Sequence, residues 1–61
     1  MTITDLEGNP LLNGVSDHTE VLAALKNEGT IKSTNEYILD EDMPGIYIVT
    51  DGRSEVAIVY D

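Results

Sequence analysis

Three consecutive acidic residues, Asp40, Glu41 and Asp42, precede a Pro-Gly turn and are the first candidates for a site with its own chemistry. Counted from Asp40, positions 1, 3, 6 and 12 imitate part of an EF-hand calcium loop, with Asp40, Asp42, Gly45 and Asp51. The imitation fails because position 5 is a proline, position 12 is not the longer glutamate, and neither flank has a helical pattern. We therefore interpret the segment as a solvated acidic loop and expect no metal site.

Ser16, Asp17 and His18 contain the residue types of a hydrolytic triad. A triad needs the base placed between nucleophile and carboxylate, and adjacent residues at the start of a helix point in different directions. We therefore assign Asp17 to helix capping and His18 to a structural or surface role. Because the chain has no second histidine, no thiol and no glycine-rich phosphate loop, we expect no catalytic residues and no cofactor.

The size and composition of the chain limit how it can be stabilised. Its 61 residues are enough for one small domain, residues 1–61, and contain no cysteine for a disulfide or a thiolate zinc site. A chain of this length buries only about 60% of the surface that its unfolded form exposes. We therefore expect a partner subunit or a binding target to add stability.

The first half of the chain predicts a strand, a turn and one helix. Alternating apolar residues favour a short strand over residues 2 to 6, the sequence EGNP predicts a turn, and Leu11 and Leu12 form a weaker second extended piece. The helix is expected over residues 17 to 28, with Asp17 at its N-cap, Glu20 three residues later, and Gly29 at its end.

The second half predicts strands. One strand is expected within residues 30 to 40, with a break near residues 33 to 35, and DEDMPG is expected to be a loop. Residues 46 to 50 and 55 to 60 form a hairpin around Asp51-Gly52, a strong hairpin signal. The expected fold class is α+β: one short helix packed on a small antiparallel sheet of three to four strands, in the order β-α-β-β-β with a C-terminal hairpin.

Both faces of the predicted hairpin are apolar. A loop of two or four residues places Tyr47 and Val49 on one face with Val56, Ile58 and Tyr60, and leaves the other face to Ile46, Ile48, Ala57 and Val59. A single helix covers only one face. The second face is therefore either wrapped by residues 1 to 14 or buried in a dimer or complex.

The acidic residues of the C-terminal half are the main candidates for partner binding. They are expected at both ends of the sheet, because antiparallel strands return the chain to each end in turn. They are either an ordinary solvated surface or a set of carboxylates that imitates the spacing of nucleic-acid phosphates. Tyr37 is added as an exposed aromatic anchor, so that the predicted partner-binding residues are Glu36, Tyr37, Asp40, Glu41, Asp42, Asp51 and Glu55.

The charge of the chain sets its preferred partners. Twelve acids against three bases give a net charge of -9, which disfavours direct binding to nucleic acid and to anionic membranes. In size and charge the chain is similar to small acidic inhibitors of phages and mobile elements, which block nucleases, CRISPR effectors or restriction enzymes by mimicking DNA. No motif matches a particular family. We therefore expect a non-enzymatic inhibitor that occupies a basic, nucleic-acid-binding surface of a target protein.

The alternative is a small assembly module that forms a homodimer or docks through an apolar sheet face. The two hypotheses differ in their response to salt, since screening weakens a contact between opposite charges and does not weaken an apolar one. No segment has the length of a membrane span or the pattern of a signal peptide, so the expected location is the cytoplasm.

Overall fold

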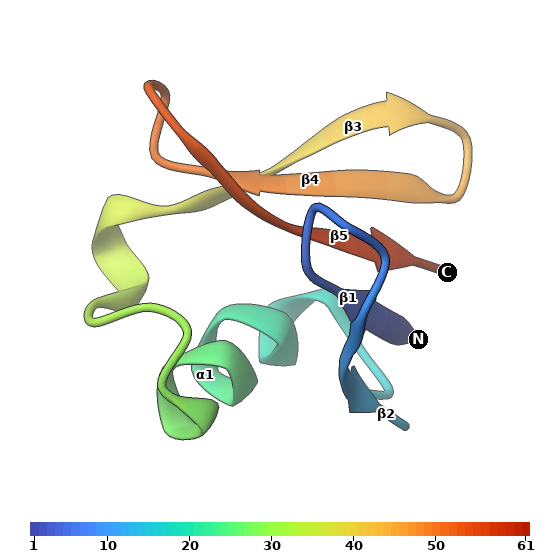
Figure 1. The fold of residues 1–61 in the computed structure, drawn as a ribbon, viewed down its shortest axis with the longest axis horizontal. Coiled ribbons are helices and arrows are strands. Elements are labelled where there is room, and N and C mark those ends of the chain that lie inside the picture. The colour runs from blue at the N-terminus through green and yellow to red at the C-terminus, as the bar shows by residue number, and fades with distance from the viewer.

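The computed structural model describes all 61 residues as a five-stranded antiparallel sheet with one α-helix packed against it (Figure 1). The elements, in chain order, are β1 (Thr2–Thr4), β2 (Pro10–Asn13), α1 (His18–Glu28), the 3-10 helix η1 (Thr34–Glu36), β3 (Ile38–Met43), β4 (Ile46–Thr50) and β5 (Glu55–Tyr60). The predicted α+β class with a C-terminal hairpin is confirmed. The sheet has five strands where three to four were expected, because the extended piece around Leu11 and Leu12 forms strand β2.

The strand order in the sheet is β2-β1-β5-β4-β3. The first strand pairs with the last, so that Thr2 lies opposite Tyr60 and the two termini lie close together (Figure 1). Residues 1 to 14 therefore extend the sheet on the β5 side and do not wrap over its second face. The two edge strands are β2 and β3.

Helix α1 begins and ends as its sequence predicts. The Asp17 carboxylate accepts the Thr19 backbone N–H at 2.9 Å, which satisfies one of the free donors at the helix N-terminus. At the other end Gly29 takes the left-handed conformation, with φ of 99°, and its N–H bonds to the Leu25 and Lys26 carbonyls. The apolar stripe of the helix, with Val21 and Leu25, packs against the sheet.

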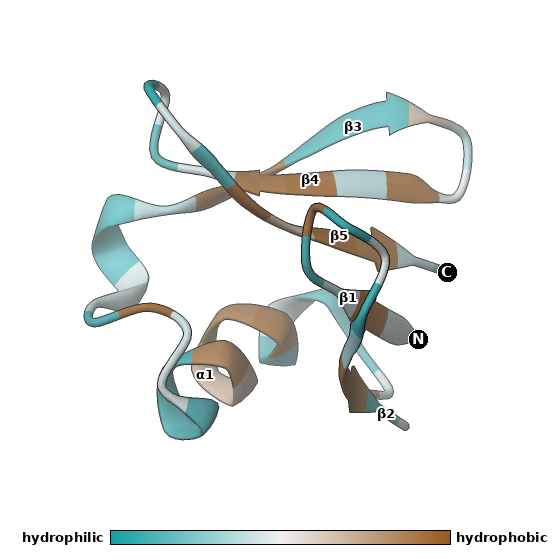
Figure 2. Ribbon diagram, in the orientation of Figure 1, coloured by the Kyte–Doolittle hydropathy of each residue, from teal (hydrophilic) through white to brown (hydrophobic).

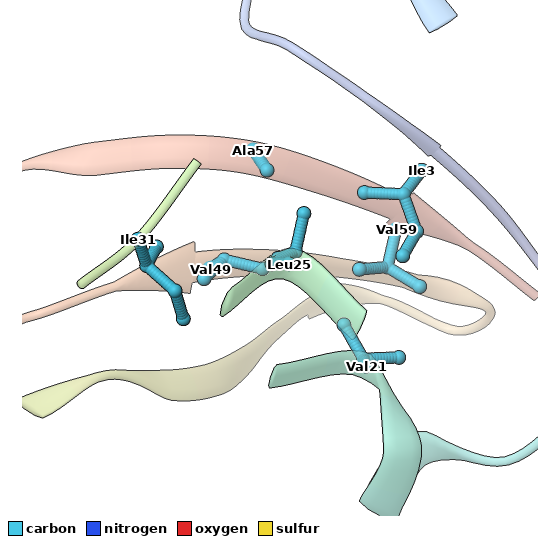
Figure 3. Packing of buried hydrophobic residues seen from close by; sticks show 7 residues of the cluster. All are labelled: Ile3, Val21, Leu25, Ile31, Val49, Ala57 and Val59. Atoms are coloured by element: carbon cyan, nitrogen blue, oxygen red, sulfur yellow. The ribbon is translucent and has the colours of Figure 1, made fainter. Parts of the chain in front are cut away.

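The hydrophobic core lies between α1 and one face of the sheet. Figure 3 shows Leu25 beside Val49, and Val21 on the neighbouring turn of the helix. The seven buried apolar residues are Ile3, Val21, Leu25, Ile31, Val49, Ala57 and Val59. The strand members of this cluster, with half-buried Leu12, Leu39 and Tyr47, define the face of the sheet that we call the covered face.

A β-bulge changes the pairing of the final hairpin. Thr50 lies opposite Glu55, but Val49 lies opposite Ala57, so β5 contains one extra residue between these pairs. The extra residue reverses which side chains share a face, because side chains alternate along a strand. The predicted face assignment was therefore wrong: Tyr47 and Val49 share the covered face with Ala57 and Val59.

The acidic triplet belongs to a strand and not to the predicted loop. Asp40 pairs with Ile48 and Glu41 with Tyr47, so the carboxylates lie on edge strand β3. Pairing with the apolar strand β4 overrides the weak strand propensity of Asp and Glu. The turn is reduced to Pro44 and Gly45, and Gly45 has φ of 85°, a conformation that suits the third position of a type II turn.

Candidate functional site

The predicted site residues divide between edge strand β3 and the end of the sheet where β3 begins. Asp40, Glu41 and Asp42 are exposed on β3. Ile38, Thr50 and Glu55 form a row across three strands, which places the β4–β5 turn and Glu55 beside the start of β3. Glu36 lies in η1, just before that start. Asp61 lies at the opposite end, since its N–H donates to the Gly45 carbonyl at 2.8 Å.

The three consecutive acids do not present one row of charge. Asp40 pairs with Ile48 and lies on the face of the sheet opposite α1, whereas Glu41 pairs with Tyr47 on the covered face. A second bulge follows Glu41, in the segment that contains Asp42. A flat surface approaching this sheet from one side therefore meets only part of the triplet.

The Asp51 carboxylate holds the turn of the hairpin that the Asp51-Gly52 pair predicted. It accepts the backbone N–H groups of Ser54 at 2.8 Å and Arg53 at 2.9 Å. These hydrogen bonds hold the pKa of the Asp51 carboxyl below its ordinary value, because they favour the charged form. Asp51 therefore stabilises the β4–β5 turn, besides contributing negative charge to that end of the sheet.

Almost all of the negative charge is unpaired within the chain. The only ion pair in the structure joins His18 Nε2 and Asp61 Oδ2 at 3.9 Å, and no lysine or arginine contacts a carboxylate closely enough to form one. Exposed Asp and Glu side chains on β3 therefore remain available to an external cation. Figure 2 shows the hydrophilic strand β3 beside the hydrophobic strand β4.

The second face of the sheet is apolar and uncovered. We define the open face as the side of β3, β4 and β5 that points away from α1 (Figure 1). The register places two rows on it, Thr2–Tyr60–Ile46–Met43 and Thr4–Ile58–Ile48–Asp40, with Ile38 beyond the second row. Its most exposed apolar side chains are Ile38, Met43 and Tyr60, at 60%, 53% and 40%.

The open face carries a free-energy cost. Ile46, Ile48 and Ile58 are half-buried by their neighbours in the sheet, but they do not contact the core cluster. Full burial of a side chain of this size contributes about 1.5–3 kcal/mol relative to full exposure. Part of that stabilisation is absent here, and contiguous exposed apolar patches of this kind mark interaction surfaces. Sequence alternation indicated such a face, but the bulge hid which residues form it.

The tyrosines have different positions from those expected. Tyr37 is half-buried and packs against the core cluster, so its prediction as an exposed anchor was wrong. Tyr47 and Tyr60 lie on opposite faces, because Tyr47 pairs with Val59 and Tyr60 with Ile46. Tyr60 is the exposed aromatic residue, and it lies on the open face.

The Ser16–Asp17–His18 segment starts the helix. The Asp17 carboxylate is occupied by the Thr19 N–H, which lowers the pKa of Asp17. His18 packs edge-on against Tyr47, with ring centroids 4.5 Å apart, and its Nε2 atom is buried without a hydrogen bond. The histidine therefore joins the helix start to the covered face of β4.

The surface has no pocket, and no three His, Asp or Glu residues lie together in a metal-binding group. No helix has the length and apolar character needed to cross a bilayer. In comparisons with family models, curated proteins and solved structures, the chain matches none of them. The candidate site is thus defined by geometry alone: the open face together with the exposed carboxylates of β3 and the sheet ends.

Proposed function

We propose that this chain is a non-enzymatic binding protein that recognises a basic surface of another protein and inhibits it. The observation that carries the proposal is the unpaired negative charge. The chain has twelve acidic and three basic residues, and no Lys or Arg forms an ion pair with any of the acids. Such a charge opposes folding through self-repulsion but accelerates association with an oppositely charged surface. A basic partner would reduce the repulsion among the carboxylates, and the negative charge would then contribute to binding.

The proposed target is a nucleic-acid-binding protein, because proteins that neutralise phosphates concentrate Lys and Arg on one surface. The chain would occupy that surface in the cytoplasm and exclude the nucleic acid, as an inhibitor of anti-restriction or anti-CRISPR type from a phage or mobile element does. The division of the triplet between two faces favours partial overlap with the phosphate path over a continuous imitation of it.

The test is affinity capture from a bacterial lysate at low and at high salt, with duplex DNA as competitor. The site variant reverses the three charges of β3, with Asp40→Lys, Glu41→Lys and Asp42→Lys. The control variant makes the same change in net charge at exposed acids of the β1–β2 turn and α1, with Glu7→Lys, Glu20→Lys and Glu28→Lys. Circular dichroism establishes that both variants fold.

We expect a basic nucleic-acid-binding protein to be captured at low salt, released as salt screens the contact, and displaced by DNA. The β3 variant should lose capture by about tenfold or more, and the control by much less, because close charge pairs set affinity and distant ones mainly steer approach. Equal losses in the two variants would contradict a role for β3. A partner retained at high salt would favour the assembly-module alternative.

A further inference from the structure

We infer that the open face is the docking surface for an amphipathic helix of a partner protein, a helix with an apolar stripe flanked by Lys or Arg. This inference rests on the proposed function, since it names the part of the basic partner that the sheet contacts. It differs from a contact made through the β3 carboxylates alone, because it places the centre of the contact on Ile46, Ile48, Ile58 and Tyr60.

The width of the apolar strip fits a single helix. Neighbouring strands lie about 4.8 Å apart, and the strip is contributed mainly by the two strands β4 and β5. Two strands with their side chains give a width of about 10 Å, which is the diameter of an α-helix. Thr2 and Thr4 bound the strip on the β1 side. On the β3 side Asp40 interrupts it, between the exposed apolar residues Ile38 and Met43.

The covered face provides an internal precedent for this arrangement. There α1 packs Val21 and Leu25 onto Val49 and its neighbours in β5 and β1 (Figure 3). A second helix on the open face would complete a layered arrangement with the sheet in the middle. The chain contains no second α-helix to do this.

The charge of the helix follows from the position of Asp40. This carboxylate lies in the same cross-strand row as Ile48 and Ile58, so anything that covers these isoleucines also approaches Asp40. A carboxylate that loses water needs a cation in compensation, and a basic residue on the flank of the helix supplies it. A second copy of this chain cannot do so well, because each copy carries a net charge of -9.

Isoleucine methyl NMR tests the inference directly, since four of the six isoleucines lie on the open face and two in the core. The reporters are Ile38, Ile46, Ile48 and Ile58, and the internal controls are Ile3 and Ile31. Three synthetic helical peptides of about 18 residues, or about five turns, serve as probes. The first has a leucine stripe with lysine flanks, the second a leucine stripe with glutamate flanks, and the third has serine in place of leucine with lysine flanks.

We expect the leucine-lysine peptide to shift the four open-face methyls, to leave the two core methyls nearly unchanged, and to bind about tenfold more tightly than either other peptide. Ile48→Asn should weaken its binding by about tenfold, as expected for a residue central to an interface. Asp40→Asn should weaken it about threefold or more. Glu7→Gln, the matched control on the β1–β2 turn, should stay within about twofold, as a charge outside the contact contributes little.

Four results would overturn the inference. If the leucine-glutamate peptide binds as tightly as the leucine-lysine peptide, charge complementarity does not select the partner. If the protein dimerises at low salt and the open-face methyl signals broaden, a second copy of the chain occupies the open face. Binding of both lysine peptides without shifts of the open-face methyls would disprove this surface but leave the proposed recognition of basic partners intact. Failure of both lysine peptides to bind would contradict both proposals. The wild-type shifts decide these outcomes even if a variant fails to fold.

Discussion

The two faces of one sheet in this protein are both apolar, but only one of them is a core. The covered face holds Val49, Ala57 and Val59 fully buried under α1. The open face, built from alternate residues of the same strands, holds Ile46, Ile48 and Ile58 half-buried with no layer above them. The difference teaches that hydrophobicity alone does not define a core, because a second layer has to cover it.

Adjacent residues of β5 provide the strongest test of this comparison. Val59→Asn places an amide without a partner in the core, and we expect it to lower the free energy of unfolding by about 3 kcal/mol. Ile58→Asn, on the open face, should lower it by less than about 1 kcal/mol. Urea denaturation of the two variants measures the difference. Similar losses would indicate that the open face is buried in solution, for instance by a second copy.

Two isoleucines outside the central strands test the same comparison without introducing a polar group. Ile31 is 3% exposed and Ile38 is 60% exposed. We expect Ile31→Ala to cost about 2–4 kcal/mol, because it removes buried methyl groups and leaves a cavity. Ile38→Ala should change stability by about 0.5 kcal/mol or less. Thermal unfolding followed by circular dichroism is sufficient, and a large loss at Ile38 would contradict an open face.

The acidic residues divide in a similar way, into those that hold turns and those that point to solvent. Hydrogen bonds from Ser54 and Arg53 lower the pKa of Asp51 in the folded state. Its contribution to stability is therefore present above the unfolded pKa of about 4 and is lost as pH falls through the lower, folded pKa. We expect Asp51→Asn to be less stable than wild type at pH 6, and the two to converge toward pH 2.

The matched variant for this titration is Glu55→Gln, at the first residue of β5 directly after the same turn, whose side chain accepts no hydrogen bond in the structure. It should unfold close to wild type at pH 6. Unfolding by urea at several pH values separates the two variants. A loss in Asp51→Asn that stays constant down to pH 2 would show that its carboxylate charge does not act through these bonds.

The smallest expected effect is a gain. Asp40 occupies a strand position on the open face, where aspartate is a poor strand former. Asp40→Thr should raise the free energy of unfolding by about 0.5 kcal/mol while weakening binding to the leucine-lysine peptide. Stability from urea unfolding and affinity from the methyl titration should thus move in opposite directions. A loss of both would assign Asp40 to folding and remove it from the proposed contact.

Local signals accounted for much of the fold. Asp17 and Gly29 marked the ends of α1, and Asp51-Gly52 marked the final hairpin. The strand expected within residues 30 to 40 was placed too early, since β3 begins only at Ile38, after η1. The charge of the site was equally readable, because it depends on composition alone. The site residues were less predictable. Tyr37 was expected to be exposed but packs against the core cluster, and the sequence pattern assigned the wrong residues to the open face.

The errors in the acidic triplet and in the open face share one physical cause, which is the register of pairing between neighbouring strands. Whether Asp40 to Asp42 form a loop or a strand depends on hydrogen bonds with β4, and one extra residue in β5 reverses both faces of the hairpin. Neither bulge has a signature in local propensity. The sequence by itself determined the helix, its caps, the turns and the excess of carboxylates, since these depend on neighbouring residues and on composition. Only the tertiary structure decided the register, and with it which apolar residues are covered and which are free to bind a partner.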